Sequence, residues 1–266
     1  MKSNRLVRTI LIFSIVMGTL SLMLMLFSTI RRSNNTYISI DLETMKLVQL
    51  EEPQDGDPIA IVDTTLGEIR FVLYPQYSPN AVKNFTELAE SGYYDNTYVF
   101  NAQSGAYSGM GTPNKDGSLA EGHDESRERI ERELHQDLWP FRGAVCCVNT
   151  TIERGLKERI LGGGTYYCGS RFNILNSIKF DEEVSNEMRG YSVSDKLDDA
   201  FIEKGGIPNF SQQMTIIGQT YKGYDVVDAL ASLEAEENGD YRTPIEDVMI
   251  KSVKISTYSS EEEKED

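Results

Sequence analysis

The stretch SPNAVKNFTELAESGYYD, residues 78–95, indicates the fold more specifically than any other part of this 266-residue chain. Ser78 followed by Pro79 is typical of a helix start, because serine is a common N-cap and proline suits the first helical turn. Before Gly92, apolar residues recur at helical spacing, at Ala81, Phe85, Leu88 and Ala89. The pattern predicts an amphipathic helix with one buried face.

Strand patterns lie on both sides of this helix. Ile59–Thr64 and Gly67–Tyr74 are rich in β-branched and aromatic residues and meet at a short turn, which predicts a β-hairpin. Further apolar runs predict strands at Val99–Phe100, Gly143–Val148, Phe172–Leu175, Met214–Ile217 and Val248–Ile255. A second short helix is predicted at Asp225–Leu230. Many strands with two spaced helices indicate a mainly β fold, a closed antiparallel barrel.

Four segments, taken in order, resemble the cyclophilin family of peptidyl-prolyl cis-trans isomerases over residues 58–256. They are residues 78–100, Phe141–Val145, Gly169–Ile174 and Thr215–Val227. The third reads Gly-Ser-Arg-Phe-Asn-Ile where the family has Gly-Ser-Gln-Phe-Phe-Ile, and Pro244–Ile250 is similar to the family's final strand. The resemblance implies an eight-stranded antiparallel barrel capped by two helices, with a proline-binding groove on its outer surface.

The resemblance also implies which residues line that groove. The residues at the family's substrate-binding positions are Tyr107, Met110, Val148, Asn149, Asn173, Phe210 and Met214. Most of them are apolar, as a pocket for a proline ring requires, but Asn173 stands where the family has a phenylalanine and interrupts the pocket floor. Ordinary packing in the barrel is the alternative interpretation of the apolar members.

The catalytic position departs from the family. In cyclophilins an arginine, two residues after a phenylalanine, donates to the prolyl nitrogen, whereas Phe100-Asn101-Ala102 has a methyl group there. Arg171 replaces a family glutamine that the fold places beside this position. Two roles are open for Arg171: a catalytic role as substitute donor, or pairing with a carboxylate at the surface.

Prolyl isomerisation requires no nucleophile, metal or cofactor. Rotation about the amide bond has a barrier of about 18–20 kcal/mol, and a site lowers it by binding the twisted amide more tightly than the planar one. A charged hydrogen bond contributes roughly 1.5–3 kcal/mol, so loss of the arginine predicts a rate reduced about 10- to 150-fold. The sequence therefore predicts no cofactor, and a weak isomerase is consistent with Ala102.

The N-terminus contains an apolar run without charge, Thr9–Ile30. Its length of about 22 residues is sufficient to cross a bilayer as a helix. Basic residues flank the run with a narrow excess on the N-terminal side, namely Lys2, Arg5 and Arg8 before it and Arg31 and Arg32 after it. This predicts a membrane anchor with a cytoplasmic N-terminus and an exported domain. A cleaved signal peptide is the alternative, although its apolar region is usually about 7–15 residues.

The predicted organisation has four parts: a membrane anchor with basic flanks at 1–32, a spacer at 33–57, the cyclophilin-like domain at 58–256 and an acidic disordered tail at 257–266. A charged stretch at residues 124–137 is predicted to be helical. Its role is not specified by any pattern in the sequence.

Charge and cysteine content exclude several function classes. The formal net charge of −16 argues against nucleic acid as a partner. A metal site is not expected, because the two histidines, His123 and His135, lie apart and no C-x-x-C pair is present. The three cysteines, Cys146, Cys147 and Cys168, are interpreted as buried thiols, with one bridge to Cys168 as the alternative.

Three functional hypotheses follow. The first is a membrane-anchored isomerase that speeds the folding of exported proteins by acting on their proline-containing segments. The second is a non-catalytic chaperone or scaffold that holds such segments, and the third is a structural protein whose groove is filled. Asn149 and Asn209 begin glycan-acceptor triplets on the expected groove, where glycans would block it. A bacterial cell membrane is therefore the expected location, with the domain on its extracytoplasmic side.

Overall fold

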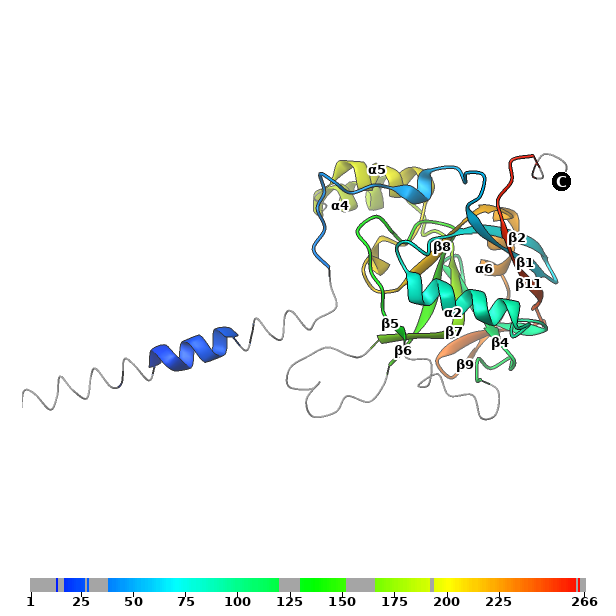
Figure 1. Ribbon diagram of the computed structural model, residues 1–266, viewed down its shortest axis with the longest axis horizontal. Coiled ribbons are helices and arrows are strands. Elements are labelled where there is room, and N and C mark those ends of the chain that lie inside the picture. The colour runs from blue at the N-terminus through cyan, green and yellow to red at the C-terminus, as the bar shows by residue number, and fades with distance from the viewer. Residues whose placement is uncertain are drawn as a thin grey trace, which may run out of the picture. The chain divides into compact units, whose positions relative to one another are not determined.

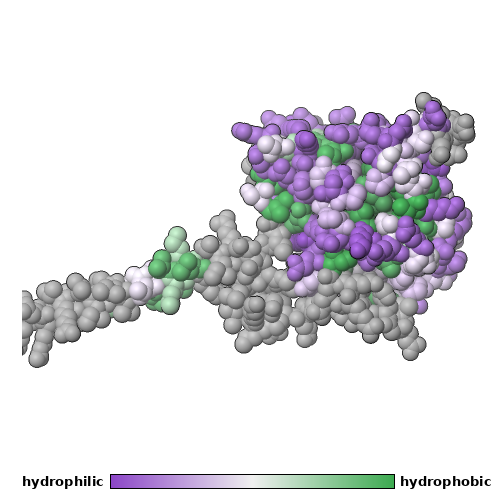
Figure 2. Space-filling model, viewed as in Figure 1, coloured by the Kyte–Doolittle hydropathy of each residue, from purple (hydrophilic) through white to green (hydrophobic). Residues whose placement is uncertain are grey.

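The structure is a computed structural model that describes residues 13, 17–26, 28, 38–119, 130–151, 166–191, 194–261 and 263. The chain divides into two compact units. One comprises residues 1–37 and 151–165, and the other comprises residues 38–150 and 166–266. The second unit contains the strands and helices that form the domain, and its surface in Figure 2 is mostly hydrophilic with a few hydrophobic patches.

The domain is an antiparallel barrel, as predicted. The strand order is β4-β3-β11-β1-β2-β8-β6-β7, and pairing of β4 with β7 closes these eight strands into a ring (Figure 1). A two-residue strand, β5, adds to β7. The strands are β1 Pro58–Thr64, β2 Gly67–Leu73, β3 Thr97–Gln103, β4 Tyr107–Thr112, β5 Ile130–Glu131, β6 Ala144–Thr151, β7 Tyr166–Leu175, β8 Ile216–Lys222 and β11 Met249–Thr257.

The predicted hairpin is confirmed by the pairing of β1 with β2, which ends at Thr64 opposite Gly67. Gly67 has a φ of 136°, and a Cβ there would lie 2.8 Å from Val226. Glycine is therefore required at position 67 for two reasons. One is the backbone conformation, and the other is the close approach of the helix that contains Val226. That helix is α6, Tyr224–Ala231, which confirms the second predicted helix.

The first predicted helix is α2, Pro79–Glu90, which buries Ala81, Val82, Phe85 and Ala89. The Phe85 ring lies 5.4 Å from that of Phe172 inside the barrel. Ser78 is the N-cap residue, as predicted, but its hydroxyl donates to the carbonyl of Ile216 and its side chain caps no helix amide. Glu133 caps the helix from another segment and accepts the Ala81 amide at 2.9 Å. This placement suits a carboxylate, which is stabilised near a helix N-terminus.

Two further helices, α4 Glu182–Tyr191 and α5 Asp195–Lys204, come from a polar stretch for which no helix was predicted. They precede the short 3-10 helix η3, Pro208–Phe210. A small hydrophobic cluster connects α5 to the barrel and contains Met45, Trp139, Phe141, Ala200 and Phe201. Figure 1 shows α4 and α5 side by side at the edge of the barrel.

Residues 38–57 pack against the domain, although this range falls in the predicted spacer. Met45 is 3% exposed and Gln49 is 2% exposed. The Gln49 side chain donates to Gln219 Oε1 at 2.8 Å and accepts the Trp139 amide at 2.6 Å. The folded unit therefore includes residues on the N-terminal side of the predicted boundary at residue 58. Contacts join residues 38–57 to the domain, and the polar composition of this segment does not predict them.

The C-terminal residues also contact the barrel. Glu263, in the predicted disordered tail, lies 2.7 Å from Arg70 and 3.1 Å from Lys222. Burial raises the pKa of Glu263. Hydrogen bonds from Arg70, Lys222 and Tyr221 together lower this pKa by more than burial raises it, so the net pKa is below the usual range. The described part of the tail is thus held by ion pairs to β2 and β8.

Most of the predicted membrane anchor lies outside the described residues. Within Thr9–Ile30, residues 13, 17–26 and 28 are described and are helical. Among described residues, no helix reaches the length and apolarity required to span a membrane. The predicted helix at 124–137 also falls partly outside the described residues, and its described part contains the strand β5 rather than a helix. His123 lies outside as well.

Candidate functional site

Three of the predicted groove residues come together. Tyr107 begins β4, whereas Phe210 and Met214 lie in and just after η3. The rings of Tyr107 and Phe210 meet edge to face with centroids 5.8 Å apart. All three side chains are half-buried and pack against a hydrophobic cluster that includes Cys146, Leu175 and Ile216. They form an apolar surface on the outside of the barrel, which we call the 107/210 surface.

The Tyr107 hydroxyl marks the polar edge of this surface. Burial raises the pKa of Tyr107, and the side chain of Asn101, on the neighbouring strand β3, opposes this shift to a smaller extent. Tyr107 therefore remains neutral at physiological pH and presents both an aromatic face and a hydroxyl group to its surroundings.

Residues near the C-terminal end of β6 supply amide groups next to the 107/210 surface. Val148 and Asn149 are half-buried near the end of this strand. Asn149 donates to the carbonyl of Gln213 at 2.6 Å, which places it one residue from Met214. Its Oδ1 atom is buried and has no hydrogen-bond partner among the described residues. A buried amide oxygen without a donor is costly, so this position is unsatisfied among the described residues.

Asn173 lies on β7 opposite Gly109 of β4. A Cβ at Gly109 would lie 2.9 Å from Asn173 Oδ1 and 3.0 Å from Phe100, so both side chains cover the face of this glycine. Asn173 is 9% exposed, and the floor predicted for the groove is therefore polar at this point.

Met110 does not lie on the 107/210 surface. It is fully buried and belongs to the main core cluster together with Val99, Phe172 and Ile174. The prediction that Met110 lines the groove is therefore corrected: Met110 packs inside the barrel. A register shift between β3 and β4 next to Val99 accompanies this position, and such shifts are not visible in a sequence pattern.

Ala102 and Arg171 do not form a catalytic pair in this structure. Ala102 is 1% exposed and pairs with Ser108. Arg171 Nη1 donates to the Tyr241 hydroxyl at 2.6 Å and to the Gly117 carbonyl at 3.2 Å. Its guanidinium carbon also lies 5.7 Å from the Phe100 ring centroid. The described partners of Arg171 thus include a phenol, a carbonyl and two aromatic rings.

Tyr241, the partner of Arg171, lies in a hairpin that was not predicted from the sequence. Strands β9, Ala235–Asn238, and β10, Tyr241–Pro244, form this hairpin, and β10 packs against β3. The Arg242 backbone amide donates to Asn101 Oδ1 at 2.9 Å, so the hairpin also holds Asn101 of β3. The signal was present, because Gly239-Asp240, the two residues between Asn238 and Tyr241, are typical of a two-residue hairpin turn.

Comparison with known families agrees with this geometry. Residues 59–159 match the family model described as cyclophilin type peptidyl-prolyl cis-trans isomerase. This part of the chain is similar to the cyclophilin family. The match reaches from β1 to β6, and the barrel continues through β7, β8 and β11.

Two bacterial proteins illustrate the relationship. A Streptococcus pyogenes protein, named provisionally as a bifunctional phosphatase/peptidyl-prolyl cis-trans isomerase, is 27% identical over 224 residues, covering 81% of this chain and 42% of that protein. A Staphylococcus aureus protein, named provisionally as a peptidyl-prolyl cis-trans isomerase, is 24% identical over 213 residues, covering 77% of this chain and 95% of that protein. The chain thus spans less than half of the first relative and nearly all of the second.

Solved cyclophilin structures share the fold. A Cryptosporidium parvum cyclophilin type peptidyl-prolyl cis-trans isomerase superposes with a TM-score of 0.55 at 19% identity, covering 77% of this chain and 99% of that one. The same protein in the presence of the dipeptide Ala-Pro gives a TM-score of 0.53 at 20% identity, covering 76% of this chain and 99% of that one. At these identities the likeness establishes the barrel and its topology.

Proposed function

We propose that this protein is a peptidyl-prolyl cis-trans isomerase of low turnover that binds proline-containing segments on the 107/210 surface. The observation that carries the proposal is the edge-to-face pair of Tyr107 and Phe210 on the outer face of a cyclophilin-type barrel. Half-buried aromatic rings provide an apolar contact for a proline ring. The Cryptosporidium parvum cyclophilin solved in the presence of the dipeptide Ala-Pro supports this class of ligand.

The neighbouring amides suit an extended peptide. Asn149 has an unpartnered carbonyl oxygen among the described residues, and Asn173 lies nearby on the barrel wall. Hydrogen bonds to the peptide backbone hold the residues around the proline in place. Apolar contact with the ring then favours a twisted amide, since the planar isomers fit the same surface less well. Without a cationic donor at Ala102 the rate enhancement is expected to be modest.

The test is a protease-coupled isomerisation assay with the full-length chain and an alanine–proline tetrapeptide. The expected result is acceleration above the uncatalysed rate that saturates with substrate and is reduced in Phe210→Ala. Tyr258→Ala is the matched control, because Tyr258 is a half-buried aromatic residue that packs against Tyr221 elsewhere on the barrel. No acceleration at any protein concentration contradicts the catalytic proposal.

A second candidate is a holding function without turnover. Two observations favour it: Ala102 has no donor side chain, and Arg171 is already bonded to Tyr241 and Gly117. In this case proline peptides bind but do not isomerise faster. Peptide titration followed by amide shifts at Tyr107, Asn149 and Phe210 distinguishes it, because a purely structural protein gives no shifts at these residues.

We further propose that the apolar run Thr9–Ile30 anchors the chain in a bacterial cell membrane, with the domain on the extracytoplasmic side. The absence of charge in this run and the basic excess before it support the proposal. Clients would then be segments of exported proteins, and tethering would raise the effective concentration of a weak site. Protease digestion of intact cells tests this, since the anchored domain is cleaved from outside only if it is exported.

A further inference from the structure

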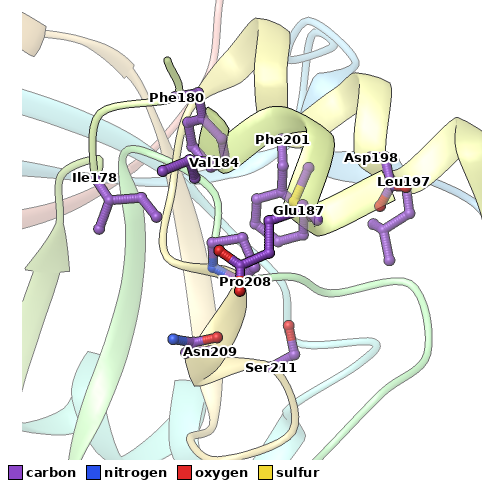
Figure 3. Close-up of a pocket in the computed structure, with 11 residues that line it drawn as sticks. Ile178, Phe180, Val184, Glu187, Leu197, Asp198, Phe201, Pro208, Asn209 and Ser211 are labelled. Carbon is purple, nitrogen blue, oxygen red and sulfur yellow. The ribbon is translucent and has the colours of Figure 1, made fainter. Parts of the chain in front are cut away.

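A cavity of about 400 Å³ lies between α4, α5 and η3, outside the 107/210 surface (Figure 3). Its walls are mainly apolar and come from three successive segments, residues 178–188, 197–201 and 208–211. The apolar lining includes Ile178, Phe180, Val184, Leu197, Phe201 and Pro208. A volume of this size accommodates one long side chain of a bound peptide.

The cavity also borders a buried acidic group. Asp198 is 3% exposed and lines the cavity, and its Oδ2 atom has no hydrogen-bond partner among the described residues. Its place in the first turn of α5 favours a carboxylate but supplies no donor to this oxygen. A buried acceptor without a donor is costly, so Asp198 Oδ2 requires a donor that the described residues do not supply.

The acidic residues in the cavity lining favour a donor that carries a positive charge. Glu187 of α4 is a second acidic residue in the lining, and none of the described lining residues is basic. The basic side chain of Arg189 is held elsewhere, by Asp199 at 2.6 Å. A ligand group with an apolar stem and a positively charged head therefore fits both the walls and the acidic groups. Lysine and arginine side chains have this form.

The cavity adjoins the proposed peptide site through two connections. Asn209 lines the cavity, and the next residue, Phe210, contacts Tyr107. Ile178, also in the lining, follows three residues after Leu175, which pairs with Tyr107. At about 3.3 Å per extended residue the second connection spans roughly 10 Å. A peptide whose proline contacts Phe210 thus reaches the cavity with a side chain only a few residues away.

We propose that this cavity is a specificity subsite that takes a lysine or arginine side chain of the client, located a few residues from the bound proline. The inference rests on the proposed function, because it requires a peptide on the 107/210 surface. The aliphatic stem lies against Phe201 and Leu197, and the cationic head donates to Asp198 with Glu187 nearby. The protein would then select basic proline-containing segments.

The experiment measures binding of fluorescent proline peptides to the full-length chain in detergent. A single lysine is moved through each position from four before to four after the proline, and norleucine and glutamate are placed at the same positions. We expect one position at which lysine binds at least ~10-fold tighter than norleucine, as a charge-assisted hydrogen bond provides. Asp198→Asn should remove this preference and leave the affinity for the norleucine peptide unchanged.

Asp199→Asn is the matched control, since Asp199 is the adjacent residue of α5 but its side chain is 61% exposed. It should retain the preference for lysine, and Glu187→Gln should weaken it. Equal affinity for lysine and norleucine at every position overturns the subsite while leaving the proposed function intact. Failure of all proline peptides to bind overturns both. A preference for lysine that survives Asp198→Asn with unchanged thermal stability also overturns the assignment.

Discussion

Arg171 Nη1 donates a 2.6 Å hydrogen bond to the hydroxyl of Tyr241, which joins the barrel wall to the β9–β10 hairpin. The same hairpin bonds Asn101 through the Arg242 backbone amide, and Asn101 pairs with Gly109, two residues after Tyr107 on β4. The hairpin therefore supports the polar edge of the 107/210 surface. This arrangement assigns Arg171 to the support of the site and leaves the prolyl nitrogen without an arginine donor in the described geometry.

The first prediction concerns Arg171→Ala. Because the guanidinium group is bonded to Tyr241 and Gly117, its loss should leave kcat/KM for a proline peptide within about twofold of wild type while lowering the melting temperature. Arg142→Ala is the control, as Arg142 pairs with Asp228 on another part of the domain. A fall in kcat of tenfold or more, with unchanged KM, would identify Arg171 as the substitute catalytic donor.

The second prediction concerns the apolar contact. Phe210→Ala removes the ring that faces Tyr107. We expect peptide affinity to weaken about tenfold, because a bound peptide covers part of the apolar area of this ring. Stability should change little, since Phe210 is half-exposed in the free protein. Isothermal titration with a proline peptide measures the effect, with Tyr258→Ala as control. Equal affinity for both variants and wild type contradicts the assigned surface.

The third prediction concerns the N-terminal boundary of the domain. Gln49→Ala removes a side chain that bonds Gln219 and the Trp139 amide, and should lower the free energy of unfolding by about 2 kcal/mol. Gln54→Ala is the matched control because Gln54 is exposed and bonds only locally to Glu52. Urea denaturation provides the comparison. Similar midpoints for the two variants would indicate that residues 38–57 contribute no stability.

The fourth prediction concerns alkaline pH. Burial raises the pKa of the Cys146 thiol above its ordinary value. The unfolded chain ionises first as pH rises above about 8.5, so folded Cys146 retains its proton while the unfolded state loses one. The contribution of Cys146 is thus fully present below that pH and falls by about 1.4 kcal/mol per pH unit above it. In Cys146→Ala the unfolding free energy should decline less steeply between about pH 8.5 and 10. Parallel pH profiles would contradict the assignment.

Three thiols, Cys146, Cys147 and Cys168, are free and buried, in agreement with the prediction from sequence. Their number and their apolar neighbours were sufficient for that conclusion, because burial of small apolar side chains follows from the strand pattern. The proximity of Cys147 and Cys168 in one core cluster was not predictable, since it depends on the lateral position of β6 against β7.

The sequence by itself determined the barrel, its two capping helices and the family. These features are encoded locally, in the alternation of apolar residues along strands, the helical spacing after Ser78, and short motifs in a fixed order. The predicted joining of Tyr107, Phe210 and Met214 at one surface also followed from the motifs, because the topology they imply brings those segments together.

Tertiary structure alone decided which distant side chains meet. It placed Met110 inside the barrel, gave Arg171 the hydroxyl of Tyr241 as its partner, used Glu133 to cap α2, and buried Gln49 against Trp139. It also left Asp198 Oδ2 without a donor among the described residues, beside a cavity built from α4, α5 and η3. These outcomes depend on contacts between different elements, where strand register and packing, rather than local propensity, select the partner.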